Sequence, residues 1–392
     1  MPSAKPETVK AAVMLAPGKM EIREYPYPSI DRDSAIIKVE MCGVCGTDKH
    51  IYQGDSTEIR GKSLFPMING HEMVGTIVEI GERAAGSMEA DGKELSPGDR
   101  VAVAVEVNCG HCWYCKNHYD NTTCENQVMA YGVHPGVEEP PHLRGGFAEY
   151  MFIFPDSILF KIPEDMPTDI AVFVEEMAVA YSSLARAAQP YPAIGEGFGP
   201  GDSAVILGNG PLGILHGIMA RIHGGGLAIA TDLADYRLDV AKRFYADHGI
   251  NASRTSPDER VREVLDLTEG IGPDLVIESA GEPAVFIEAL EMVRKGGTVI
   301  EVGNWVDRGD TVPLNVMKHI TSKNVHIHSV YHCGNVWGRI LNILRRHADR
   351  FPLQELISHR LGLAEIVENM EIVQDPNQCM KVEVVPHRAP VA

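Results

Sequence analysis

The chain has 392 residues, with 35 Lys and Arg against 54 Asp and Glu, which gives a formal net charge of −19. This acidic balance disfavours nucleic acids and anionic membrane surfaces as partners, because both carry negative charge. We find no apolar run long enough to span a bilayer and no apolar core of a secretion signal, so we expect a cytoplasmic protein of two or three domains. In that compartment, its eight cysteines indicate metal binding or catalysis rather than disulfides.

The first hundred residues alternate short apolar and β-branched runs with Gly, Pro and Asp. The runs occupy residues 11–15, 35–41, 72–81 and 99–105. Short strands with turn residues between them are typical of sandwiches and barrels. We therefore predict an all-β region of barrel type from Val9 to Val103.

A first cluster of potential metal ligands interrupts this region. It consists of Cys45, Thr47, His50, His71 and Glu72. Sulfur, imidazole nitrogen and carboxylate oxygen are all good zinc ligands. Because successive side chains of a regular strand point to opposite faces, either the backbone bends at His71 or one of His71 and Glu72 does not ligate; Gly70 favours a bend. The alternatives are a small buried Cys45, a hydrogen-bonded core His71, and a polar loop carrying Thr47 and His50.

A second cluster is formed by four cysteines in a short segment. Three of them recur at three-residue steps and the fourth follows nine residues later: Cys109, Cys112, Cys115 and Cys124. This spacing predicts a closed, tetrahedral zinc site with a structural role. A reduced cluster without metal would be open to oxidation. A zinc ribbon that binds nucleic acid is disfavoured by the acidic charge.

The stretch from Ala204 to Asp232 predicts a strand, a tight turn, a helix and a second strand. Gly208, Gly210 and Gly213 follow the apolar run 204–207 at the spacing of a dinucleotide-binding turn. Gly224 to Gly226 ends the helix, and Asp232 closes the next strand at the position where an acid accepts ribose hydroxyls. The alternative is an ordinary strand–helix turn with incidental glycines.

Strands and helices alternate from Ala204 onward. The strands are expected at 204–207, 227–230, 250–254, 275–278, 298–302 and 325–330. Such alternation predicts a doubly wound parallel sheet, so the fold class is α/β with a separate barrel. After Tyr331 we expect helices at 336–347 and 364–373. The last strand, 380–385, is expected to rejoin the barrel.

The segment between the two regions is predicted to be helical from Pro167 to Ala187. It contains Glu175 and Glu176 among mostly apolar neighbours, which makes a solvent-exposed position for both less favourable. The alternative is that these carboxylates belong to a solvated helix face. The following stretch, Pro190 to Pro200, is rich in Gly and Pro and indicates a surface connection.

These motifs together resemble the zinc-dependent medium-chain alcohol dehydrogenases, in the branch of the sorbitol, polyol and L-threonine dehydrogenases. The resemblance extends over roughly residues 10 to 386. It includes Cys45-Gly-Thr-x-x-His50, Gly70-His-Glu72, Gly145-Gly-Phe-Ala-Glu-Tyr150, the four-cysteine lobe and the dinucleotide turn. The last gap of the lobe is one residue longer than usual, and residues 190–200 resemble an insertion.

The resemblance implies zinc chemistry at the first cluster. Cys45 and His71 are the implied ligands, and Glu72 and Glu175 compete for the third place, with Glu176 in the position of a frequent proline. One catalytic and one structural Zn²⁺ per chain are expected, the first acting as a Lewis acid. Thr47 is expected to accept the alcohol proton and pass it towards His50 through the cofactor ribose.

The resemblance also implies the domain plan and the cofactor. A GroES-like catalytic β-barrel domain is expected at 1–178 and 333–392, with a Rossmann domain for NAD inserted at 179–332. The expected cofactor-binding residues are Gly208, Gly210, Leu212, Gly213, Asp232, Arg237, Val302 and Asn304. Asp232 would repel the 2′-phosphate of NADP, so NAD is expected to be preferred.

The predicted activity is hydride transfer between NAD and a secondary alcohol that resembles a polyol or a hydroxy-amino acid, in a homodimer or homotetramer. A zinc-free quinone or enoyl reductase of the same fold family is one alternative, although Cys45, His71 and the cysteine lobe disfavour it. A non-enzymatic structural protein is the other, and intact metal ligands disfavour that as well.

Overall fold

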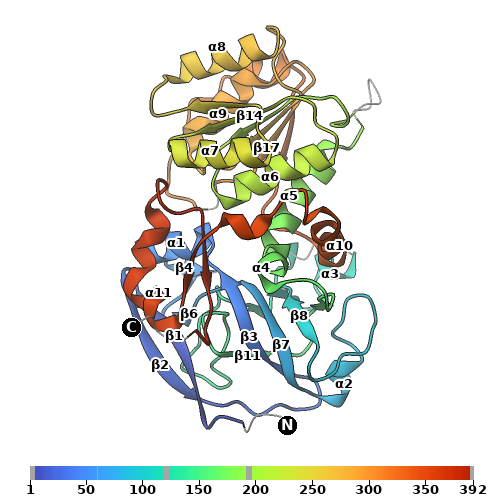
Figure 1. Ribbon diagram of the computed structural model, residues 1–392, viewed down its shortest axis with the longest axis vertical. Coiled ribbons are helices and arrows are strands. Elements are labelled where there is room, and N and C mark those ends of the chain that lie inside the picture. The colour runs from blue at the N-terminus through green and yellow to red at the C-terminus, as the bar shows by residue number, and fades with distance from the viewer. Residues whose placement is uncertain (1–4, 60, 118–122, 191–196, 305, 389–392) are drawn as a thin grey trace. The chain divides into compact units, whose positions relative to one another are not determined.

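The computed structural model describes residues 5–59, 61–117, 123–190, 197–304 and 306–388. The chain divides into two compact units, which are described separately (Figure 1). The first comprises residues 1–175, 334–374 and 381–392, and the second comprises residues 176–333 and 375–380. Among the described residues, no helix combines the length and apolarity that crossing a bilayer requires.

The first unit is built on a mixed sheet with the strand order β12-β8-β7-β3-β20-β19, and β11 also pairs with β3. Its strands are β3 (Ala35–Gly43), β7 (Glu72–Ile80), β8 (Arg100–Val103), β11 (Tyr150–Ile153), β12 (Leu159–Lys161), β19 (Ile357–Leu361) and β20 (Lys381–Val384). A second sheet has the order β2-β1-β6, from β1 (Thr8–Ala16), β2 (Lys19–Pro26) and β6 (Met67–Ile68). The expected barrel region is confirmed.

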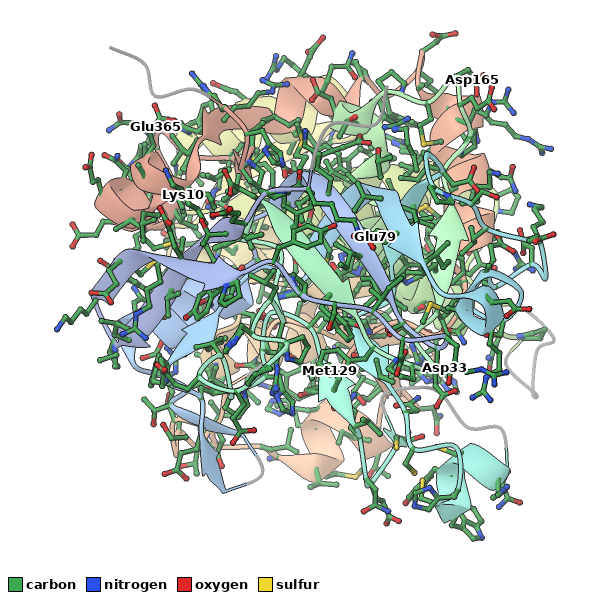
Figure 2. All side chains as sticks on the ribbon, turned by 90° about the horizontal axis from the view of Figure 1, so that it is seen from below. Lys10, Asp33, Glu79, Met129, Asp165 and Glu365 are labelled. Carbon is green, nitrogen blue, oxygen red and sulfur yellow. The ribbon has the colours of Figure 1, made fainter. Side chains whose placement is uncertain are left out.

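The end of the chain returns to this first sheet, as the sequence predicts. β20 pairs antiparallel with β3, so the C-terminal strand lies beside one formed more than 300 residues earlier (Figure 1). Two pairs of short strands complete the unit: β4 (Glu58–Ile59) with β5 (Lys62–Ser63), and β9 (Glu106–Val107) with β10 (Met129–Ala130). Side chains fill the space between the strands (Figure 2). The exposed Asp165 lies at the edge of the molecule in the same figure.

Short helices connect the strands of the first unit. They are α1 (Gly46–Gln53), α2 (Glu82–Ala85), α3 (Trp113–Lys116), α4 (Thr168–Ala171), α10 (Trp337–His347), η3 (Leu353–Leu356), α11 (Leu363–Asn369) and η4 (Met370–Gln374). The sequence predicts the last helices to within a few residues, but not α1. That helix carries polar side chains on most of its turns, so no apolar periodicity marks it.

The second unit is a six-stranded parallel sheet in the order β15-β14-β13-β16-β17-β18. Its strands are β13 (Ala204–Leu207), β14 (Ala228–Asp232), β15 (His248–Asn251), β16 (Leu275–Glu278), β17 (Thr298–Glu301) and β18 (His326–Ser329). The order reverses at β13, which is the arrangement of a doubly wound nucleotide-binding sheet. The expected Rossmann fold is confirmed, although the strand expected at 250–254 begins at His248.

Helices cover both faces of this sheet because the crossovers run in opposite directions from β13. The helices are α6 (Pro211–Ile222), α7 (Asp235–Phe244), α8 (Pro257–Leu267), α9 (Pro283–Met292) and η2 (Met317–Thr321). α6 packs against β13 and α7, whereas α8 packs against α9 (Figure 1). The apolar core between β13, β16, α8 and α9 is fully buried and includes Val205, Val276 and Leu290.

The single helix expected from Pro167 to Ala187 is wrong, because the chain forms two helices, α4 and α5 (Val174–Ala187). Val172, Phe173 and Val174 lie at the break, and each is at most 2% exposed. Within the expected connection 190–200, residues 191–196 lie outside the described residues.

Candidate active site

The short helix α1 positions three of the predicted site residues. Cys45 is its N-cap residue, and the Asp48 carboxylate accepts the Cys45 backbone N–H at 2.9 Å. Thr47 lies in the first turn, with its Oγ1 3.7 Å from Cys45 Sγ. His50 lies one turn later, so the polar-loop alternative for Thr47 and His50 is wrong. Residues three apart on a helix share a face, which places Thr47 and His50 on one side of α1.

A bend at Gly70 brings His71 and Glu72 to the same place. Gly70 has a φ of +93°, in the region that glycine adopts readily. A Cβ there would lie 2.6 Å from the Phe147 ring and 2.7 Å from Cys42 Sγ, so only glycine fits. The regular strand starts at Glu72, directly after the bend. The bend that the sequence required for both residues to reach one ion is therefore present.

Cys45, His71 and Glu72 form a compact donor set. Each offers one ligand atom, and these atoms lie within 4.8 Å of one another. His71 Nδ1 and Glu72 Oε1 are buried and have no hydrogen-bond partner in the part of the chain that is described. The alternative of a satisfied core histidine is thus wrong for His71. These two buried atoms without partners, together with the sulfur of Cys45, make a set of one nitrogen, one oxygen and one sulfur that fits a zinc ion.

A lysine that sequence reasoning missed holds the other oxygen of Glu72. Lys381 Nζ, from β20, donates to Glu72 Oε2 and, at 3.3 Å, to the carbonyl of Val44. The Lys381 and Glu72 side chains are only 1% and 0% exposed. A Cβ on Gly43 would lie 1.8 Å from Glu72 Oε2, so glycine is required there. The only signal in the sequence is that a lysine begins the short final strand, which is expected to rejoin the barrel.

Charge accumulates in this cluster. Burial raises the pKa of Glu72 to about 7, Lys381 opposes that shift, and Glu175 adds to it. Burial also raises the pKa of the Cys45 thiol well above its ordinary value, and Glu72 and Glu175 raise it further. Three acidic groups, those of Cys45, Glu72 and Glu175, are therefore close to the positive charge of a single lysine, Lys381. A bound divalent cation would relieve this repulsion, which is a second reason why the donor set suits a metal.

Glu175 lies in the first turn of α5 and is 4% exposed. It interacts electrostatically with Cys45 and Glu72, although it is outside the group whose ligand atoms lie within 4.8 Å. Glu176 is also buried, at 6% exposed. The solvated-face alternative is therefore wrong for both glutamates.

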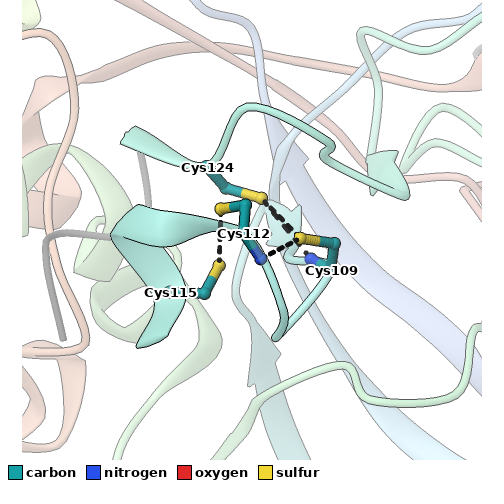
Figure 3. Close-up of side chains that lie close together, drawn as sticks. All are labelled: Cys109, Cys112, Cys115 and Cys124. Atoms are coloured by element: carbon teal, nitrogen blue, oxygen red, sulfur yellow. Dashed lines mark hydrogen bonds between the residues drawn. The ribbon is translucent and has the colours of Figure 1, made fainter. Parts of the chain in front are cut away.

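The four predicted cysteines gather in one lobe beside α3 (Figure 3). Cys112 Sγ lies 3.5 Å from Cys115 Sγ, and Cys124 Sγ lies 3.6 Å from Cys109 Sγ. Backbone N–H groups donate to the sulfurs of Cys109 and Cys124 at 3.3 and 3.4 Å. Residues 118–122 of the lobe lie outside the described residues.

The environment of these thiols favours metal binding. All four are free cysteines. Hydrogen bonds from the backbone at Cys115 and Glu125 lower the pKa of Cys112 to about 6, whereas burial and neighbouring thiols raise the pKa of Cys115 to about 12. Thiols that share protons at such short separations are a suitable set for one tetrahedral zinc ion, which binds thiolates.

The glycine-rich turn of the second unit has the geometry that its spacing predicts. Gly208 has a φ of +86°, and a Cβ there would lie 2.7 Å from the backbone of Ala280. A Cβ on Gly213 would lie 2.0 Å from the Gly208 carbonyl oxygen, so this glycine permits close packing of helix on strand. Gly210 is the N-cap residue of α6, where backbone N–H groups are available to a phosphate.

Asp232 ends β14 beside this turn and is 7% exposed. Its carboxylate accepts the backbone N–H of Asn209 at 2.7 Å and that of Ala234 at 2.9 Å, which fixes its position. Arg237 Nη1 lies 3.6 Å from the Cβ position of Gly210, and its buried Nε lacks a hydrogen-bond partner among the described residues. Leu212 lies in the first turn of α6. This turn therefore combines an acid and a cation.

The remaining predicted cofactor residues follow β17, at the carboxyl end of the parallel sheet where ligands bind. Val302 N–H donates to the Glu278 carbonyl, and Asn304 Nδ2 lies 3.3 Å from Glu278 Oε2 and 3.0 Å from Glu301 Oε1. Glu278 was not predicted. Burial raises its pKa to about 8, and the neighbouring Glu301 adds to the shift.

Comparisons with known proteins agree with this arrangement. Residues 31–164 match the alcohol dehydrogenase GroES-like domain, and residues 211–346 match the zinc-binding dehydrogenase family. The sorbitol dehydrogenase of Bacillus subtilis is 30% identical over 98% of this chain and 99% of that protein. The L-threonine 3-dehydrogenase of Xanthomonas campestris is 28% identical over 90% of this chain and 93% of that protein.

A solved structure extends the similarity to the whole fold. The alcohol dehydrogenase of Thermotoga maritima matches with a TM-score of 0.85 and 28% identity, over 97% of this chain and 100% of that one. The chain is thus similar to dehydrogenases along nearly its full length, and it carries the donor sets and the dinucleotide turn that such proteins need. It belongs to the zinc-dependent medium-chain alcohol dehydrogenase family, in the branch that contains the sorbitol and L-threonine dehydrogenases.

Proposed function

We propose that the protein transfers a hydride between NAD and a secondary alcohol that resembles a polyol or a hydroxy-amino acid. The observation that carries this proposal is the donor set of Cys45, His71 and Glu72, in which the buried His71 Nδ1 and Glu72 Oε1 lack hydrogen-bond partners among the described residues. The sorbitol and L-threonine dehydrogenases among its relatives support the substrate class. The substrate is a small molecule, and we propose that neither nucleic acids nor membranes are partners.

The catalytic zinc ion is proposed to bind Cys45 and His71, with Glu72 or Glu175 in the third place. Membership of the 4.8 Å group favours Glu72, whereas its bond to Lys381 keeps one of its oxygens engaged. The structural zinc ion is proposed to bind Cys109, Cys112, Cys115 and Cys124. When bound, the catalytic zinc would supply a Lewis acid for the substrate oxygen, and the dinucleotide would supply a hydride acceptor.

The chain itself must remove the alcohol proton. The Thr47 hydroxyl, close to Cys45 Sγ, is proposed to accept that proton. His50 lies one turn further along α1 and is 26% exposed, so it can exchange the proton with solvent. A neutral imidazole carries both a proton donor and a proton acceptor on its ring, which suits this role.

NAD is proposed to be preferred to NADP. Asp232 is held at the end of β14 by two backbone N–H groups, where a 2′-phosphate would meet its negative charge. A like-charge contact at about 4 Å is worth roughly 4 kcal/mol at an effective dielectric near 20. Arg237 lies beside the same turn and weakens this discrimination. Gly208, Gly210, Leu212, Gly213, Val302 and Asn304 complete the proposed cofactor site.

We further propose the domain limits 1–178 and 333–392 for the catalytic domain and 179–332 for the NAD domain, in a cytoplasmic homodimer or homotetramer. The two compact units have boundaries within a few residues of these limits, apart from residues 375–380.

The experiment that tests the proposal combines metal analysis with a substrate panel. We expect two zinc ions per chain, and NAD-dependent oxidation of at least one secondary alcohol, polyol or hydroxy-amino acid. An active protein that contains no zinc would contradict the metal assignment and favour the zinc-free reductase. Equal kcat/KM for NAD and NADP would contradict the cofactor preference alone.

A further inference from the structure

The residue between the first two glycines of the dinucleotide turn directs its side chain into the protein. This residue, Asn209, is 0% exposed. Its Nδ2 donates to the carbonyls of Ile206 at 3.2 Å and Thr231 at 3.0 Å, and its Oδ1 accepts the hydroxyl of Tyr245. The orientation of the amide is thus determined, because its nitrogen faces two acceptors and its oxygen faces a donor.

Tyr245 reaches this amide from the end of α7. It is 4% exposed, and its backbone N–H donates to the Ala241 carbonyl at 2.8 Å as the C-cap of the helix. Arg221 Nε donates to the Tyr245 carbonyl at 2.8 Å. The ring crosses α6 at Gly217, where a Cβ would lie 2.4 Å from three ring carbons. A glycine in α6 therefore makes room for the ring that carries this hydroxyl.

The backbone of Asn209 holds the acid of the turn. Its N–H donates to Asp232 Oδ2 at 2.7 Å, while the Ala234 N–H donates to Oδ1 at 2.9 Å. Gly208 and Gly210 flank Asn209, so the backbone that carries this N–H has little steric restraint of its own. The side-chain bonds of Asn209 supply that restraint. Each oxygen of an ionised carboxylate accepts about two hydrogen bonds, so both oxygens of Asp232 keep a lone pair for a ribose hydroxyl.

We propose that Tyr245 is a positioning residue for the cofactor, which acts through Asn209 to hold the Asp232 carboxylate in place for the ribose hydroxyls. This inference rests on the proposed NAD site. Burial raises the pKa of Tyr245 well above its ordinary value, and the charge of Asp232 raises it further, so the hydroxyl keeps its proton and remains a donor. Tyr245 therefore determines the affinity for the adenosine half of the dinucleotide.

The test measures dissociation constants by calorimetry on the purified full chain. One ligand is NAD, and the other is the NAD analogue whose adenosine ribose lacks both hydroxyl groups. Tyr245→Phe removes the hydroxyl and keeps the ring over Gly217. We expect this variant to bind NAD roughly tenfold more weakly, which corresponds to the loss of one buried hydrogen bond. Its affinity for the analogue should stay within about twofold of wild type, because the analogue lacks the groups that Asp232 binds.

A second variant tests whether the effect passes through the amide. Asn209→Ala should weaken the binding of NAD more than that of the analogue, and adding Tyr245→Phe to it should cause no further loss. Tyr131→Phe is the matched control, because Tyr131 is also buried, at 0% exposed, and its hydroxyl lies 2.7 Å from Ser157 Oγ in the first unit. It should lower Tm without a change in the affinity for NAD.

The outcomes separate this inference from the proposed function. Equal losses for NAD and the analogue in Tyr245→Phe would overturn the inference, because the variant would then disturb the whole turn. Wild-type affinity for NAD in Tyr245→Phe, or the same loss in the Asn209→Ala background as in the wild type, would also overturn it. A wild-type protein that does not bind NAD would instead contradict the proposed cofactor, and the inference with it.

Discussion

The two clusters of potential zinc ligands are built in different ways. The cysteine lobe takes all four donors from sixteen consecutive residues, 109–124, which include the short helix α3. The other cluster joins Cys45 at the start of α1, His71 and Glu72 after a bend, and Lys381 from a strand more than 300 residues away. A local cluster needs only its own loop, whereas an assembled cluster needs the whole unit to fold first.

This difference matches the role that we propose for each cluster. A closed set of four thiolates leaves no coordination position for substrate and stabilises the fold. A set of three ligands leaves one coordination position of the metal open. A lysine that is paired with one of these ligands adjusts the charge around that position. The predictions below change one feature of this comparison at a time.

The largest effect is expected from Cys45→Ser. Removal of the thiolate should release the catalytic zinc, which supplies several kcal/mol of charge stabilisation, so kcat should fall roughly 10³-fold or more. Zinc content should fall from two ions to one, and Tm should change little because α1 keeps its Asp48 cap. Activity and metal analysis on the same sample check this. Retention of two zinc ions with normal turnover would show that Cys45 is not a ligand.

Thr47→Ala should be next, and it separates the proton path from the metal. Positioned proton transfer contributes roughly 10²–10⁴-fold, and Thr47 is the hydroxyl beside Cys45, so its loss should lower kcat within that range. His50→Ala should be slower than wild type but partly restored by added imidazole, because solvent buffer replaces a peripheral base. Zinc content should stay at two in both variants. A His50→Ala protein with wild-type rates and no response to imidazole would remove His50 from the path.

Much of this arrangement is predictable from local spacing. The four cysteines, the glycines at 208, 210 and 213, and Gly70-His71-Glu72 are each defined within a few residues, so the sequence displays them directly. Lys381 and Glu278 were not predicted, because their partners come from other strands and no spacing rule links them. Asp55, whose Oδ2 lies 2.8 Å from His50 Nδ1, was missed for a different reason. Its partner is near in sequence, but α1 lacks the apolar periodicity that would predict the helix and its terminal turn.

Cys112→Ser should reverse the pattern of Cys45→Ser. Loss of a metal from a closed site falls in the exceptional range for one substitution, roughly 4–5 kcal/mol, so Tm should fall while kcat of the remaining folded protein is nearly unchanged. Zinc content should again fall to one ion. Thermal unfolding with metal analysis measures this, and Cys42→Ser, a buried cysteine outside both clusters, is the control that keeps two zinc ions. Unchanged zinc content in Cys112→Ser would contradict the structural assignment.

Lys381→Met tests the cation that distinguishes the assembled cluster. Removing one partner of a buried ion pair leaves an uncompensated charge and costs roughly 3–5 kcal/mol, so the free energy of unfolding of the metal-free protein should fall by that amount. Adding Glu72→Gln to the same chain should recover most of the loss, because no buried charge then remains. Urea unfolding of the single and double variants after chelation measures the difference. Equal losses in both would show that Lys381 acts through packing and not through Glu72.

The smallest effect is expected from Glu278→Gln. Glu278 extends the comparison because burial favours its protonated form, whereas the buried Glu72 is paired with a lysine. The Glu278 side chain is 0% exposed, and its Oε1 accepts the backbone N–H groups of Ala280 and Gly281. Because its pKa is raised to about 8 in the folded protein, the folded state retains a proton that the unfolded chain releases near pH 4.5. Stability from this group is therefore complete below about pH 4.5, falls as pH rises, and is lost above about pH 8.

Gln cannot ionise but keeps an acceptor oxygen for both N–H groups, so the variant should come closest to the wild type at pH 5 and exceed its stability at pH 9. The difference in free energy of unfolding between the two proteins, measured with urea from pH 5 to 9, separates the interacting pair Glu278 and Glu301 from the other titrating groups. Glu288→Gln is the matched control, because Glu288 is also buried, at 6% exposed, but is paired with Arg260 at 2.6 Å. That variant should be destabilised at every pH, since it leaves a buried guanidinium without its carboxylate. A difference for Glu278→Gln that does not change with pH would mean that the carboxylate is already ionised at pH 5, and that the backbone N–H groups compensate its charge as a lysine does for Glu72.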